Sequence, residues 1–153
     1  MSDDGDAPGG PPRPHPIDDV WGRRARLVHR ANPHSRLDYL VTLRGTIHPA
    51  DASCLAGEAD RAAALLRYVP DRDVLAPDAL DDYFADLGAR PWDSLEALAT
   101  TFLEDVNNEL VPRWVMVTLS TPAGPYDDGH SVTIEDRQPR WNNQVLLNRL
   151  ERI

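Results

Sequence analysis

The chain has 153 residues, 41% of them hydrophobic, and its 25 acidic against 16 basic residues give a net charge of -9. This length fits one domain with a sizeable core and leaves no room for a separate cofactor domain. The acidic balance argues against a direct nucleic-acid partner, because proteins that bind phosphate backbones concentrate Lys and Arg. A single cysteine, with no long apolar stretch and no N-terminal leader, predicts a cytoplasmic protein without membrane contact.

The N-terminal region divides into two parts. Residues 1–16 are mostly Asp, Gly and Pro and have little to bury, so we expect a disordered tail. Residues 17–31 place apolar side chains among four arginines and predict a short helix or an arm that lies on a neighbouring subunit. We expect the folded domain over residues 17–136 and a C-terminal tail over residues 137–153.

Two strands are expected next. Over Leu37–Thr46, residues that suit a pleated surface alternate between two faces, which is typical of a strand. Residues 58–67 contain a run of Ala and Leu that favours a helix locally. The alternation that continues to Pro70 favours a strand instead, and tertiary context overrides propensity most easily in short segments. We therefore predict a second strand here.

Two helices follow in the sequence. Pro77 suits the first turn of a helix that closes at Gly88. The second helix is predicted to take Asp93 as its N-cap and to end before Pro112. Its apolar residues form one stripe that belongs to the core, namely Leu95, Leu98, Ala99, Phe102, Leu103, Val106 and Leu110.

The last third of the domain predicts a hairpin. Trp114–Leu119 and His130–Glu135 have the composition of strands, and residues 122–129 join them. Apolar residues near the C-terminus then predict a short amphipathic helix that docks on this subunit or a neighbour. The order of two strands, two helices and two strands predicts an α+β fold with an antiparallel sheet and both helices on one face.

Cys54 is the only sulfur nucleophile in the chain, and Asp60 follows six residues later. A thiolate adds readily to an electrophilic carbon, and a nearby carboxylic acid can protonate the atom that becomes negative. From the residues alone, the alternatives are an inert buried cysteine and a solvated loop carboxylate.

Short motifs around these residues occur in a particular order: Asn32-Pro33-His34 with Asp38-Tyr39, Ser53-Cys54 with Asp60, Arg67-Tyr68-Val69-Pro70-Asp71, Glu96, and Pro112-Arg113-Trp114. From about Asn32 to Ile134 the chain thereby resembles the nitrile reductases of queuosine biosynthesis, which act on 7-cyano-7-deazaguanine. The resemblance implies the tunnelling fold (ββααββ). In that fold the sheets of several subunits close into a barrel with active sites between subunits, so a homo-oligomer is expected.

The resemblance also implies roles for four residues. Cys54 matches the cysteine that attacks the nitrile to form a covalent thioimide, and Asp60 matches the acid that gives protons to its nitrogen. The loop between them is one residue shorter than is usual in the family. Glu96 matches the glutamate that holds the pyrimidine edge of the base, although Asp93 and Glu96 also have the spacing of a capping box. Leu95, the other candidate substrate-binding position, stands where the family has a histidine.

The cofactor is where the chain departs from the family. NADPH is implied by the resemblance, but in the segment matching the NADPH signature, residues 76–83, two lysines are replaced by Asp78 and Asp81. These carboxylates repel a dinucleotide phosphate. No metal is expected. The resemblance implies an enzyme that reduces a purine-like nitrile to the aminomethyl product through a Cys54 thioimide. One alternative is NADPH-independent formation of an amidine from the thioimide and ammonia. The other is a non-catalytic subunit that binds a purine-like ligand or a partner.

Overall fold

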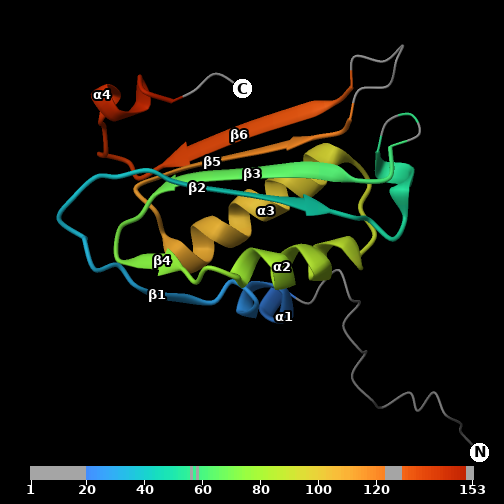
Figure 1. The fold of residues 1–153 in the computed structure, drawn as a ribbon, viewed down its shortest axis with the longest axis horizontal. Helices are drawn as coiled ribbons and strands as arrows, with labels where there is room; N and C mark the ends of the chain where they lie inside the picture. Colours follow the sequence, from blue (N-terminus) through green and yellow to red (C-terminus); the bar gives the residue numbers. More distant parts are fainter. Residues whose placement is uncertain (1–19, 56, 58, 123–128, 151–153) are drawn as a thin grey trace, which may run out of the picture.

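A four-stranded antiparallel sheet forms the centre of the computed structural model, which describes residues 20–55, 57, 59–122 and 129–150 (Figure 1). Its strands lie in the order β2 (Val41–Ile47), β3 (Ala62–Val69), β5 (Trp114–Ser120) and β6 (Ser131–Arg137). All four were predicted, including β3, whose run of alanines favours a helix locally. The expected tail over residues 1–16 lies outside the described residues.

Helices α2 (Ala79–Gly88) and α3 (Leu95–Leu110) lie on the same face of this sheet (Figure 1). Residues of each strand alternate between the two faces, and the helix-covered face supplies the buried side chains Ile47, Leu66, Tyr68, Val117 and Leu119. Phe84 of α2 packs so closely on β2 that a Cβ atom added to Gly45 would lie 2.5 Å from its ring. The α+β prediction with both helices on one face is therefore confirmed.

The beginning of α3 differs from its prediction. Ser94, not Asp93, is the N-cap, and its Oγ accepts a hydrogen bond of 3.0 Å from the backbone N–H of Ala97. Ser and Asp cap almost equally well, so the two adjacent candidates could not be ranked from sequence. With Ser94 as the cap, the residue at the third helical position is Ala97, and Glu96 takes no part in a capping box.

Two short strands form a second sheet that the sequence did not predict. β1 (His29–Ala31) pairs antiparallel with β4 (Asp73–Leu75). Just before β1, α1 (Val20–Ala25) packs against α2 and α3. Residues 17–31 were expected to form a short helix or an arm on a neighbour. The short helix is present as α1, and it packs on its own chain.

The C-terminal segment lies on the face of the sheet that α2 and α3 leave open. It contains the short helix α4 (Gln144–Leu147), which Figure 1 shows on the opposite side of the sheet from α2. Asp38 anchors the segment by accepting hydrogen bonds of 3.1 Å from Trp141 Nε1 and 3.0 Å from Asn143 Nδ2. A short docked helix was predicted here. Residues 151–153 lie outside the described part of the chain.

Candidate functional site

The topology brings the candidate catalytic elements to one end of the sheet. β2 ends where β3 begins, with Ile47 opposite Ala62, and β5 ends where β6 begins, with Ser120 opposite Ser131. The loop between β2 and β3 holds the 3-10 turn η2 (Ala52–Cys54) and Asp60. The start of α3 reaches the same end, to the right in Figure 1. We call this end of the sheet the Cys54 end.

Cys54 is almost completely buried, with 8% of its surface exposed. Its Sγ is 3.8 Å from the backbone oxygen of Asp51, and the side chain belongs to the hydrophobic core. Burial raises the pKa of the Cys54 thiol, and the nearby charge of Asp51 raises it further, although a backbone hydrogen bond acts in the opposite direction. The thiol is therefore neutral near pH 7 and is covered in the single chain.

Asp60 lies in the same loop but faces solvent. Its side chain is 77% exposed, and its Oδ1 accepts a hydrogen bond of 3.1 Å from Nη1 of Arg61. Within the described part of this loop, no hydrogen bond joins Asp60 to Cys54. The structure thus places the two candidate catalytic residues in one loop without bringing the carboxylate to the sulfur.

Glu96 has the accessibility expected of a ligand-binding residue. Its side chain is 60% exposed, and Oε2 lies 3.1 Å from Nε2 of His130. The pKa of Glu96 is lowered first by its own backbone N–H and then by the hydrogen bond with His130. Because Ser94 caps α3, this ionised carboxylate is not part of a capping box, although it accepts a hydrogen bond from its own backbone N–H in the first turn.

Leu95, next to Glu96 on α3, faces the core and not the solvent. Its side chain is completely buried and is part of the hydrophobic core. This agrees with the apolar stripe predicted for α3 and leaves the side chain no access to a ligand in the single chain. The prediction of Leu95 as a substrate-binding position therefore gains no support.

His130 is a site residue that sequence reasoning missed. It follows the connection between β5 and β6, and its backbone is fixed by Thr121: the Thr121 N–H donates to His130 O at 2.8 Å, and the His130 N–H donates to Thr121 Oγ1 at 3.0 Å. The contact with Glu96 spans 34 residues. Local pattern carries no signal for such a contact, so only the folded chain shows it.

Next to this pair, the helix-free face of the sheet is hollowed at the Cys54 end. The hollow has a volume of about 260 Å³. Its lining is mostly small and polar, with one arginine, and consists of Thr46, Arg61, Ala63, Ser120, Thr121 and Pro122. Thr121 lines it and also accepts a hydrogen bond from the backbone N–H of His130. Cys54, Glu96 and His130 are not among the residues that line the hollow.

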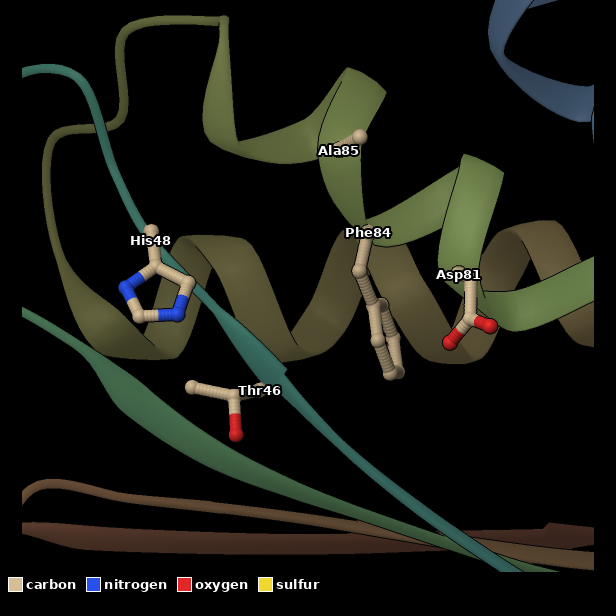
Figure 2. Close-up of a pocket in the computed structure, with 5 residues that line it drawn as sticks. All are labelled: Thr46, His48, Asp81, Phe84 and Ala85. Atoms are coloured by element: carbon tan, nitrogen blue, oxygen red, sulfur yellow. The ribbon is translucent and has the colours of Figure 1, made fainter.

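A second cavity, of about 330 Å³, lies between the end of β2 and α2 (Figure 2). Thr46 and His48 come from the strand side, and Asp81, Phe84 and Ala85 come from the helix. Asp78 and Asp82 are exposed on the same first part of α2 as Asp81. Three carboxylates suit a helix N-terminus, but they do not fit the phosphates of NADPH. The segment that the resemblance assigns to NADPH therefore does not suit that cofactor.

The other motif residues gather at the opposite end of the sheet. Tyr39 Oη donates to Asn32 Oδ1 at 2.6 Å, and Asn32 Nδ2 donates to the backbone oxygen of Asp71 at 2.8 Å. Arg113 bridges the carboxylates of Asp38 and Asp71 at 3.1 and 3.2 Å. These contacts hold the chain before β2 against the ends of β3 and β5. Their role in the single chain is structural.

Comparison with known proteins adds no assignment, because neither a protein-family model nor a curated protein matches the chain. Among the described residues, no group of three or more His, Cys, Asp or Glu side chains is placed to hold a metal ion. The described helices include none with the length and apolar character needed to cross a membrane.

Proposed function

We propose that the protein binds a 7-deazaguanine nitrile and joins it to Cys54 as a thioimide. One observation carries the proposal: Glu96 is an exposed, ionised carboxylate at the same end of the sheet as Cys54. A carboxylate accepts hydrogen bonds from two adjacent N–H donors, such as those on the pyrimidine edge of a guanine-like base.

The proposed step adds the thiol across the triple bond. A bond forms between Sγ of Cys54 and the nitrile carbon, one C–N π bond breaks, and the nitrogen takes up one proton. The neutral thiol carries that proton, so the step is balanced without another reactant. Asp60, exposed in the same loop, is the proposed carrier of the proton between sulfur and nitrogen.

The fate of the thioimide depends on the second reactant. Reduction to the aminomethyl product needs a hydride donor, and the exposed carboxylates of Asp78, Asp81 and Asp82 do not suit NADPH. Ammonia requires no phosphate site. Its nitrogen would add to the thioimide carbon and expel the Cys54 thiol, which leaves an amidine. The surface of α2 therefore favours the amidine over the reductase outcome.

A second candidate function has its own support. Cys54 is buried, its pKa is raised, and in the described part of the loop no hydrogen bond joins it to Asp60. These features favour a non-catalytic subunit that binds a purine-like ligand through Glu96 and leaves the cysteine inert.

Intact-mass spectrometry after mixing with 7-cyano-7-deazaguanine distinguishes the two functions. The catalytic proposal predicts a gain equal to the mass of the nitrile, lost in Cys54→Ala and weakened in Glu96→Gln. Glu104→Gln is a matched control, because Glu104 is also exposed on α3. An unmodified wild-type mass at saturating nitrile, with binding still detected by calorimetry, would establish the non-catalytic function. Ammonium or NADPH is then added to the adduct to identify its fate.

We also propose that the domain adopts the tunnelling fold and works as a homo-oligomer. The central sheet has the ββααββ order, and in the described chain β2 and β6 each have one neighbouring strand. Open edges of this kind pair readily with other strands. Pairing β6 of one copy with β2 of the next continues the antiparallel sheet and places the Cys54 ends of neighbouring copies side by side.

A further inference from the structure

The imidazole of His130 lies against the proposed base-reading carboxylate. Its Nε2 is 3.1 Å from Oε2 of Glu96, and the side chains are 32% and 60% exposed respectively. An exposed pair of this kind contributes little to folding stability. Its position at the rim of the proposed site therefore calls for another role.

The backbone of His130 is fixed by hydrogen bonds. The reciprocal hydrogen bonds with Thr121 fix its backbone where β6 begins. Glu96 is held in turn by the first turn of α3, with Ser94 as the cap. The Nε2–Oε2 contact thus joins the start of β6 to the first turn of α3. It adds a second restraint to a glutamate side chain whose carboxylate also bonds to its own backbone N–H.

We propose that His130 is a positioning residue for base recognition: it holds Oε2 of Glu96 so that Oε1 faces the N–H donors of the ligand. The inference rests on the proposed function. With Leu95 buried in the core, α3 offers no imidazole at that position. The imidazole beside Glu96 comes instead from the connection between β5 and β6. Preorganising a carboxylate in this way strengthens binding because less side-chain freedom is lost when the ligand arrives.

The test measures adduct formation on Cys54 by intact mass across a series of 7-cyano-7-deazaguanine concentrations. His130→Ala is expected to raise the half-saturating concentration about tenfold and to leave the limiting rate within about twofold of wild type. His130→Gln keeps an N–H donor near the position of Nε2 and is expected to recover most of the affinity. His29→Ala is the control, because His29 lies in β1 and its ring nitrogen Nδ1 is 3.0 Å from the backbone oxygen of Leu27.

The outcomes separate this inference from the proposed function. An unchanged half-saturating concentration in His130→Ala, with normal adduct in the wild type, would overturn the inference alone. Failure of His130→Gln to recover affinity would also count against it, since a side chain that supplies only bulk or stability is not rescued by an amide. If the wild type forms no adduct, the proposed catalysis fails. Equilibrium binding of the nitrile to wild type and His130→Ala then decides the inference, and equal affinities overturn it.

Discussion

Tyr83 donates a hydrogen bond of 2.6 Å from its Oη to Oδ2 of Asp105, a carboxylate that is completely buried. Arg23 and Arg24 donate to the same carboxylate, and Arg23 is itself buried. Burial, followed by the charge of Asp105, raises the pKa of Tyr83 well above its usual range. The hydrogen bond to Asp105 raises the pKa of Arg23. This network joins α1 to α2 and α3.

Replacing Asp105 by alanine is expected to lower the free energy of unfolding by about 3–5 kcal/mol, because the change leaves a buried arginine without its partner. Urea denaturation followed by circular dichroism measures the effect. Glu104→Ala, the exposed neighbour on the same helix, is expected to stay within about 0.5 kcal/mol of wild type. Equal losses in the two variants would show that the network adds no stability.

The buried position of Cys54 predicts slow alkylation. Iodoacetamide reacts with the thiolate, and burial places the thiol pKa above its ordinary value of 9.0. The labelling rate of the native protein is therefore expected to reach its midpoint at a higher pH than that of the chain unfolded in guanidinium chloride. Cys54 is the only cysteine, so the label needs no mapping. A native midpoint below the unfolded one would instead indicate an activated thiolate.

Charge reversal at the start of α2 is expected to change the affinity for NADPH. The wild type should bind it weakly, and Asp78→Lys combined with Asp81→Lys should strengthen binding by about tenfold or more, since two repulsive charges become attractive. NADPH fluorescence gives the affinity. Glu109→Lys combined with Glu104→Lys changes the net charge equally on α3 and serves as the control. Tight binding to the wild type would show that the electrostatic argument is wrong.

The open edges of the sheet predict self-association. Light scattering over a concentration series is expected to give a mass several times that of the 17.1 kDa chain. A monomer throughout the micromolar range would contradict both the assembly and a site shared between copies.

Much of the fold could be predicted because its signals are local. Alternation identified β2 and β3, and composition identified β5 and β6. The apolar stripe identified α3, whose predicted core residues are buried. The β1–β4 sheet could not be predicted in the same way. Each strand has three residues, and the pairing of His29 with Leu75 depends on a distant segment. The Arg23–Asp105 pair was missed because a charged residue at a buried position is identified only through its partner.

In the candidate site, too, local signals could be predicted and long-range contacts could not. The positions of Cys54, Asp60 and Glu96 at one end of the sheet follow from the order of strands and helices. Whether a side chain is exposed or buried does not follow from that order. The burial of Cys54 and the exposure of Asp60 match the alternatives that the residues alone had left open, an inert cysteine and a solvated carboxylate. The presence of His130 beside Glu96 depends on how the β5–β6 connection folds back to α3.

The docked C-terminal segment would limit how copies of this domain can assemble. α4 lies over the helix-free face, where Leu147 faces Trp114 and Met116 across a cavity of about 460 Å³. If copies form a ring with this face inward, each subunit places one such segment in the central channel. The channel of the ring is then narrower than the sheets alone would make it. In such a ring, a bulky group attached to α4 would compete with closure.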